Sequence, residues 1–154
     1  MLNIVILAIG KIKTKYFQDA INEYQTRLRP YAKIQMKELP AKAFDTNNKE
    51  QIKREETEKI IKALEKYPEA KIFILDENGK EFTSPELSKK IASENKQIVM
   101  VIAGSLGFDQ SLLNPAWKKL SLSRLTFPHE MARMILLEQI YRAIAIEKNK
   151  EYHY

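Results

Sequence analysis

The sequence predicts an α/β fold, in which a mainly parallel sheet is covered by helices on both faces. Two observations lead to this prediction. Residues 2–9 and 98–103 are apolar almost throughout, which is typical of strands buried on both faces of a sheet. Such segments alternate with segments of helical periodicity, and this alternation is typical of β-α-β units. Because no linker, repeat or low-complexity tract divides the chain, residues 1–154 are expected to form a single domain.

Four elements are expected in the first half of the chain. Helices are recognised there by apolar residues at helical spacing, and strands by short apolar runs. In chain order the elements are a strand over residues 2–9, a helix from residue 14 that ends at Pro30, a strand over residues 34–39 and a helix over residues 49–67. The mixed charges between residues 53 and 59 are expected to face solvent rather than to bind a partner.

The second half is expected to contain strands and helices in alternation. In chain order they are a strand over residues 71–76, a turn over residues 77–80, a helix opened by Ser84, a strand over residues 98–103, a short helix over residues 109–117, an interrupted strand over residues 120–127 and a helix from about Glu130 to Asn149. At the start of the first of these helices, Ser84 suits the capping position and Pro85 the first helical position. Glu86 suits the positive helix end.

The strand expected over residues 120–127 changes register part of the way along. Leu120 and Leu122 share one face of a strand, whereas Leu125 and Phe127 fall on the other, because strand side chains alternate with period two. An irregular segment is therefore expected directly before the most apolar helix of the chain.

That last helix carries apolar side chains nearly all round. A helix that covers one face of a sheet hides only one stripe of its surface, so a further surface is expected to cover the rest. A second copy of the chain is the economical candidate, because two-fold homodimers are the commonest assemblies. Complete burial within one domain is the alternative.

The composition excludes several classes of protein. The chain has no cysteine, which excludes disulfides, thiol nucleophiles and cysteine metal sites. His129 and His153 are its two histidines, and no pair of ligands has the spacing of a zinc motif, so no metal is expected. The GxGxxG, P-loop and GxSxG motifs are also absent, and Ser105 has no evident base. A nicotinamide enzyme, a P-loop NTPase and a serine hydrolase are therefore disfavoured.

Charge and hydropathy place limits on the partners. The 26 Lys and Arg residues outnumber the 20 Asp and Glu residues, and the formal net charge of +6 suits a polyanionic partner without requiring one. The apolar start of the chain lacks a basic leader and a cleavage site, and it is too short to span a bilayer. A cytoplasmic protein with no membrane partner is expected.

Ligands of open α/β sheets bind beyond the carboxyl ends of the strands. Gly10, Gly104 and Gly107 directly follow expected strands, and the lack of a side chain lets a ligand approach the backbone there. Simple tight turns explain each glycine equally well. A site built from the backbone of several strand ends suits a neutral or cationic nucleoside rather than a triphosphate.

Two groups of residues are candidates for contact with RNA. Lys11, Lys13 and Lys15 follow the first strand and suit nucleic-acid phosphates, although exposed lysines are ordinary. Tyr152 and His153 suit stacking on an extruded base and assistance with a proton transfer. A disordered tail without a role is the alternative for this second pair.

Five motifs along the chain have the order and spacing of a known family. They are GKIKTKYFQDAINEYQTRL near the start, LDENGKEFTSPELS in the middle, IAGSLGF after the fourth strand, LSLSRLTFPHEMARMILLEQIYRA near the end and YH in the tail. Over essentially its whole length the chain resembles the ribosomal RNA large subunit methyltransferase H family of the SPOUT, or α/β-knot, superfamily. The resemblance implies a homodimer with a C-terminal trefoil knot. It also implies methylation of N3 of a pseudouridine in 23S ribosomal RNA of the assembled ribosome, with S-adenosylmethionine as the methyl donor.

The resemblance further implies roles for particular residues. The positions that match the cofactor shell are Leu75, Gly104, Ser123, Arg124, Leu125, Thr126, Phe127 and Pro128. Tyr152 and His153 match the tail that handles the target base, and His129 is either catalytic or packed in the first turn of a helix. Arg133 and Arg142 match as well, and they serve either RNA phosphates or carboxylates of the chain itself.

The chain departs from the family pattern at four positions. Tyr154 stands where a basic residue is usual, Glu151 where proline is usual, Ala103 where glycine is usual and Phe108 where leucine is common. A non-catalytic ribosome-binding protein that keeps the fold and the cofactor pocket is therefore the alternative function. An α/β nucleotide-binding or signalling domain is a third, and the missing phosphate loops count against it.

Overall fold

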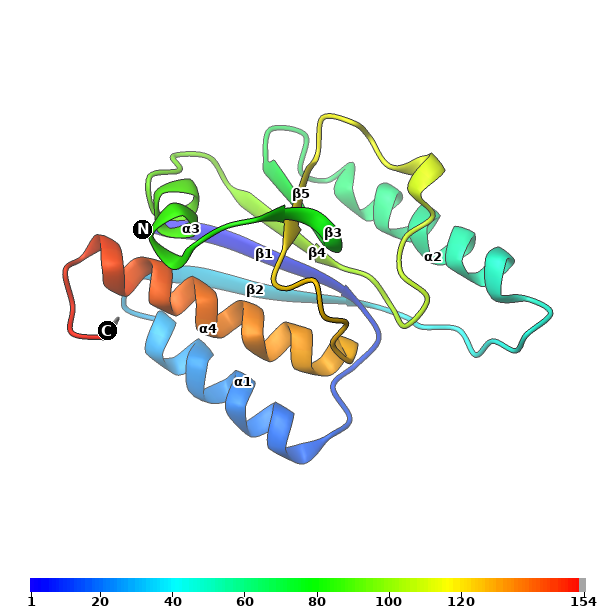
Figure 1. The fold of residues 1–154 in the computed structure, drawn as a ribbon, viewed down its shortest axis with the longest axis horizontal. Coiled ribbons are helices and arrows are strands. Elements are labelled where there is room, and N and C mark those ends of the chain that lie inside the picture. Colours follow the sequence, from blue (N-terminus) through cyan, green and yellow to red (C-terminus); the bar gives the residue numbers. More distant parts are fainter. Residues whose placement is uncertain (153–154) are drawn as a thin grey trace.

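Five parallel strands form the centre of the computed structural model, which describes residues 1–152 (Figure 1). They are β1 (Leu2–Ile9), β2 (Ala32–Leu39), β3 (Lys71–Glu81), β4 (Ile98–Ile102) and β5 (Lys118–Ser121). Their order across the sheet is β2-β1-β4-β3-β5, and every neighbouring pair is parallel. The predicted parallel sheet is confirmed. All five strands consequently end at the same edge.

Helices cover both faces of this sheet, as the apolar strands predicted. The helices are α1 (Lys15–Leu28), α2 (Lys49–Leu64), α3 (Ser84–Ala92) and α4 (His129–Glu147), with a short 3₁₀ helix η1 (Gln110–Leu112). Helix α4 lies beside α1 on one face and also packs against α3, whereas α2 covers the opposite face (Figure 1). Within residues 1–152, no helix is long and apolar enough to cross a membrane.

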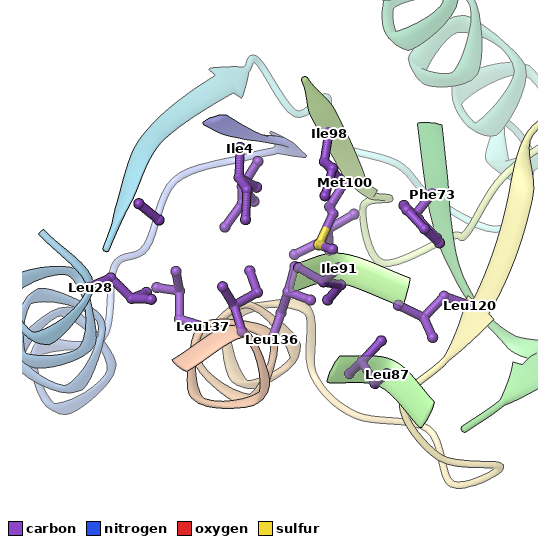
Figure 2. Close-up of a cluster of buried hydrophobic side chains, with 14 of the residues drawn as sticks. Ile4, Leu28, Phe73, Leu87, Ile91, Ile98, Met100, Leu120, Leu136 and Leu137 are labelled. Atoms are coloured by element: carbon purple, nitrogen blue, oxygen red, sulfur yellow. The ribbon is translucent and has the colours of Figure 1, made fainter. Parts of the chain in front are cut away.

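The hydrophobic core has two layers because successive residues of a strand point to opposite faces. In β1, Ile4 and Ile6 pack in the layer beneath α1, α3 and α4, and Val5 and Leu7 pack in the layer beneath α2. Figure 2 shows the first layer, where Leu136 of α4 and side chains of β1, β4 and α3 converge. The two layers hold the carboxyl ends of the strands in fixed relative positions.

The prediction of a turn over residues 77–80 is wrong. Strand β3 continues to Glu81, and the pairing with β5 shifts register, so that Leu75 and Lys80 both stand opposite Leu120. The residues between them form a large bulge. Gly79 is required there, because a Cβ atom would lie 2.7 Å from the backbone carbon of Lys119.

The helix cap expected at Ser84 is also wrong by one residue. Thr83 is the N-cap: its hydroxyl accepts a hydrogen bond from the Glu86 amide, and the Glu86 carboxylate accepts one from the Thr83 amide. This is a complete capping box. Ser84 is therefore the first helical residue, and Pro85 takes the second position.

Several other boundaries differ from the sequence prediction, most by one or two residues and three by more. The helix expected over residues 109–117 is the single 3₁₀ turn η1, and the helix expected to reach residue 67 ends at Leu64. The strand expected over residues 120–127 ends at Ser121. The change of register in the sequence thus marks the end of the strand, and residues 122–128 form a loop before α4. The trefoil knot stays a prediction.

Candidate active site

A cleft of about 850 Å³ opens at the carboxyl edge of the sheet. It lies between the β3 bulge, the loop after β4, the loop after β5 and the start of α4. Of the residues expected to bind a cofactor, those that line it are Leu75, Gly104, Ser123, Leu125, Thr126, Phe127 and Pro128. These residues come from three separate strand ends. A cleft of this size is typical of small-molecule sites.

Arg124 does not line the cleft, although its neighbours in the loop do. Its side chain is 87% exposed, and its Nε atom lies 3.3 Å from the Glu81 carboxylate. An exposed ion pair of this kind contributes little to stability. The structure therefore gives Arg124 no contact with the site.

Gly104 brings the loop after β4 against the core. A Cβ atom at this position would lie 2.9 Å from Oε1 of Glu56 and 3.1 Å from Cγ2 of Ile9. Glu56 is only 4% exposed, and its other oxygen accepts a hydrogen bond from the Lys42 amide at 3.2 Å. Glu56 and Ile9 therefore leave no room for a side chain at position 104. The sequence marked Gly104 as a candidate, but nothing in the sequence indicated Glu56.

The loop over residues 122–128 is tied to the β3 bulge by side-chain hydrogen bonds. The Ser121 hydroxyl makes hydrogen bonds to the carbonyls of Glu77 at 3.1 Å and Ser123 at 2.9 Å. The Thr126 hydroxyl donates to the Glu77 carboxylate, and the Leu125 amide donates to the Ser123 hydroxyl at 3.0 Å. These bonds hold the loop against the β3 bulge, where both line the cleft.

The bulge contributes residues that the sequence analysis did not single out. Asp76, Glu77 and Asn78 all line the cleft. The Asp76 carboxylate accepts hydrogen bonds from the Asn78 amide at 2.9 Å and from the Gln110 side chain at 2.9 Å. Two carboxylates at the wall make the cleft more suitable for a cationic ligand than for an anionic one. Their role was hidden because residues 77–80 were expected to form an ordinary turn.

His129 is the first residue of α4 and lines the cleft. Its Nδ1 atom lies 3.5 Å from the Ser105 hydroxyl. The sequence analysis found no base for Ser105, and the fold supplies this imidazole from 24 positions further along the chain. Within residues 1–152 no carboxylate makes a hydrogen bond to the His129 ring, so the third member of a hydrolase triad is missing from this part of the chain.

Arg133 was expected to contact RNA, and the structure corrects this expectation. The residue is 1% exposed. Its Nη1 atom lies 2.6 Å from the Glu38 carboxylate, and its Nη2 atom donates to the Gly10 carbonyl at 3.0 Å. A buried guanidinium that is engaged with the chain itself has no reach to RNA phosphates. The alternative role, pairing with a carboxylate of the chain, is the one that the structure supports.

Tyr152 lies against the middle of α4 rather than in the cleft. Its hydroxyl donates to Glu138 at 3.2 Å, its ring makes an edge contact with Tyr141, and the Arg142 guanidinium lies 4.8 Å above it. Arg142 also donates to Glu138 at 2.6 Å and to the Tyr152 carbonyl at 3.3 Å, which again favours an intramolecular role over an RNA contact. Burial raises the pKa of the Tyr152 phenol, so the hydroxyl is a donor at neutral pH.

The tail and the cleft are separated along α4 within one chain. His129 lines the cleft and Glu138 binds Tyr152, and nine residues of helix span roughly 13 Å. His153, the first candidate for handling the target base, lies outside the described residues. Lys11, Lys13 and Lys15 are exposed at the start of α1, where Lys15 pairs with Asp19 at 2.6 Å.

No cluster of potential metal ligands occurs among residues 1–152. The polar groups at the cleft are backbone amides and carbonyls, hydroxyls, the side-chain amides of Asn78 and Gln110, two carboxylates and one imidazole. This set is suited to holding an organic ligand by hydrogen bonds and apolar contact.

Comparisons with known proteins agree on one family. The family model described as a predicted SPOUT methyltransferase matches residues 2–153. Two curated relatives, from Kosmotoga olearia and Parabacteroides distasonis, are both named ribosomal RNA large subunit methyltransferase H. They are 40% and 41% identical to the chain, and the matches cover 99% of it and 100% and 99% of their own lengths.

A solved structure supports the same architecture. The structure of a probable methylase family protein from Haemophilus influenzae matches with a TM-score of 0.60 at 14% identity, covering 99% of this chain and 71% of that one. At this identity the likeness shows a shared fold alone.

Proposed function

The chain belongs to the SPOUT methyltransferase family, and from this premise we propose that it methylates large-subunit ribosomal RNA with S-adenosylmethionine as the methyl donor. The finer target, N3 of a pseudouridine in 23S ribosomal RNA of the assembled ribosome, follows the resemblance of its motifs. The site of action is then the cytoplasm, where ribosomes assemble. The observation that carries the proposal is the cleft formed by Leu75, Gly104 and the loop over residues 122–128.

The chemistry of the cleft suits this donor. S-adenosylmethionine supplies a methyl group that is already activated on a cationic sulfonium. Leu75 and Phe127 offer apolar surface for an adenine ring, and the backbone of residues 103–107 offers amides and carbonyls for its polar edge. The carboxylates of Asp76 and Glu77 provide negative charge at the wall, which favours a cation over a triphosphate.

The protein's contribution to the reaction is positioning and the exclusion of water. The new bond joins the methyl carbon to N3 of the base while the bond between carbon and sulfur breaks, and the N3 proton passes to a base or to solvent. The loop over residues 122–128, tied to the β3 bulge through Ser121 and Thr126, lines the cleft and would limit the access of water to a bound donor. Holding two reactants in line in this way lowers the entropic part of the barrier.

The tail residues enter the proposal through a homodimer. Tyr152 binds to Glu138 in the middle of α4 in its own chain, roughly 13 Å along the helix axis from His129 in the cleft. A second copy packed against α4 would bring its Tyr152 and His153 near this cleft, where they would handle the target base. His129, which lines the cleft beside Ser105, would orient the donor or the base. The exposed lysines Lys11, Lys13 and Lys15 would bind phosphates.

The test is methyl transfer from labelled S-adenosylmethionine to ribosomes that lack the modification. Wild-type protein should transfer one methyl group per ribosome, and a chain without residues 152–154 should bind the ribosome but transfer none. Isothermal titration with S-adenosylmethionine, with ATP as control, reports on the cleft separately. Binding of the donor and the ribosome without transfer by the wild type would instead establish a non-catalytic ribosome-binding protein, the alternative that the altered tail residues Glu151 and Tyr154 keep open.

A further inference from the structure

The start of α4 touches two regions that have different tasks in the proposed reaction. On one side, Pro128, His129 and Ala132 line the cleft. On the other side, Glu130 and Arg133 bind the segment that joins β1 to α1, which we call the lysine loop and define as residues 10–15, Lys15 being the first residue of α1. We infer, on the basis of the proposed function, that Glu130 and Arg133 are positioning residues that hold the lysine loop in the form that binds RNA and couple it to the methyl-donor cleft.

Glu130 binds the end of the lysine loop through its backbone. One carboxylate oxygen accepts hydrogen bonds from the Lys13 amide at 2.7 Å and from the Thr14 amide at 3.0 Å, and the other contacts the Thr14 hydroxyl at 3.4 Å. These hydrogen bonds also lower the pKa of the Glu130 carboxyl, with the Thr14 amide as the largest cause. The group is therefore ionised at neutral pH, and hydrogen bonds to a charged acceptor are the stronger kind.

Arg133 binds the beginning of the same loop. Its Nη2 atom donates to the carbonyl of Gly10, whose backbone has a φ of 87°, in the left-handed region that favours glycine. Its Nη1 atom lies 2.6 Å from Glu38 at the end of β2, which fixes the guanidinium itself. Both ends of the lysine loop are thus attached to the first two turns of α4.

The attachment does not use the lysine side chains, of which that of Lys15 pairs with Asp19. Lys11, Lys13 and Lys15 are exposed, and α4 holds the loop through the Lys13 and Thr14 amides, the Thr14 hydroxyl and the Gly10 carbonyl. Phosphate contacts that set the register of a protein on RNA need such fixed positions. Because the first turns of a helix move as one body, a ligand that fixes the positions of Pro128 and His129 in the cleft also fixes the position of the lysine loop.

Two explanations predict opposite changes in RNA affinity for a substitution at Glu130, one based on positioning of the lysine loop and one based on charge alone. Removing a negative charge beside three lysines would tighten RNA binding if charge alone mattered. Removing a group that holds the lysine loop in place would instead weaken RNA binding. Glu130→Ala removes both the charge and the acceptor, whereas Glu130→Gln removes the charge but keeps a side-chain oxygen that accepts from the two amides.

The experiment measures the affinity of the full-length protein for unmodified ribosomes, with Glu50→Ala as the matched control. Glu50 is an exposed carboxylate of α2 that pairs with Lys53, so its removal changes the net charge equally at a remote place. We expect Glu130→Ala to weaken ribosome binding about tenfold, with the affinity for S-adenosylmethionine within about twofold of the wild type. Glu130→Gln and Glu50→Ala should bind ribosomes as tightly as the wild type or more tightly. Equal or tighter binding by Glu130→Ala would overturn the inference.

Amide hydrogen exchange tests the coupling without RNA. Addition of S-adenosylmethionine to the wild type should slow exchange at the Lys13 and Thr14 amides, and in Glu130→Ala these amides should exchange faster and no longer respond. If the donor binds and exchange at these amides does not change, the coupling is refuted while the proposed function stands. If the wild type binds neither the donor nor ribosomes, the proposed function itself fails.

Discussion

Gly104 offers the sharpest test of the cleft geometry, because its environment allows a magnitude to be worked out. In Gly104→Ala the new Cβ atom would lie 2.9 Å from Oε1 of Glu56 and 3.1 Å from Cγ2 of Ile9. Both distances are below ordinary van der Waals contact, and Ile9 is buried in the core. Either the Glu56 carboxylate or the loop after β4 must shift, and because Glu56 is buried and accepts a hydrogen bond from the Lys42 amide, we expect the loop to move outward, into the cleft. Overpacking of this kind costs roughly 2 kcal/mol, which corresponds to about 6 °C in Tm for a chain of this size.

Thermal unfolding and titration with S-adenosylmethionine measure the two consequences. We expect Gly104→Ala to lower Tm by about 6 °C and to weaken donor binding about tenfold, because the displaced loop fills part of the cleft. Gly107→Ala is the control for the thermal unfolding measurement alone, because Gly107 also lines the cleft. A Cβ atom at Gly107 would meet nothing within 4 Å, so that substitution carries only the strain of a φ of 77°.

Removal of Glu56 separates crowding from other effects of the substitution. In a double-mutant cycle, Gly104→Ala should cost less free energy of unfolding in a Glu56→Ala background, because one of the two close contacts is gone. An equal cost in both backgrounds would refute the argument from crowding. Unchanged donor affinity in Gly104→Ala would refute the assignment of this loop to the donor site.

Three further predictions concern other parts of the structure. Gly79→Ala should lower the free energy of unfolding by about 3 kcal/mol in chemical denaturation, because its Cβ atom would meet rigid backbone at Lys119, and a smaller loss would contradict the bulge geometry. Thr83→Ala should cost about 1 kcal/mol in the same assay by removing the cap of α3, whereas Ser84→Ala should cost little. The lowered pKa of Glu130 means that its attachment of the lysine loop is intact above the ordinary carboxyl pKa near 4.3 and is lost as the pH falls through the lowered value. Exchange rates at the amides it binds, corrected for intrinsic pH dependence, should therefore rise in acid in the wild type, and a rise of equal size in Glu130→Gln would contradict this.

Much of the fold followed from the sequence because its strands are apolar on both faces. Residues 2–9 were expected as a buried strand and are β1 with the same bounds, and the parallel arrangement was expected from the alternation of strands and helices. The errors fall where local signals compete with tertiary contacts. The sequence Glu77-Asn-Gly-Lys80 has the residues of a turn, but pairing with β5 keeps it in an extended bulge.

Only part of the candidate site was predicted from the sequence, and the reason why a residue was or was not predicted differs from one residue to another. Leu75, Gly104 and most of residues 123–128 were expected at the carboxyl edge, and they line one cleft. Arg133 was expected to face RNA, because a sequence shows the charge of an arginine but not the carboxylate that neutralises it. The contacts of Glu130 with Lys13 and Thr14 join positions 117 and 116 residues apart, and no pattern of spacing indicates such a pair.

By itself the sequence determined the class of fold, the family resemblance and the edge of the sheet where the cleft opens. These depend on periodicity, on the apolar runs and on motifs that are local in the chain. Only the tertiary structure decided that the β3 bulge supplies Asp76 and Glu77 to the cleft, that Arg133 is buried against Glu38 and Gly10, and that the start of α4 holds the lysine loop. The physical reason is that burial and hydrogen bonding are properties of neighbours in space, and the core alone sets which distant residues become neighbours.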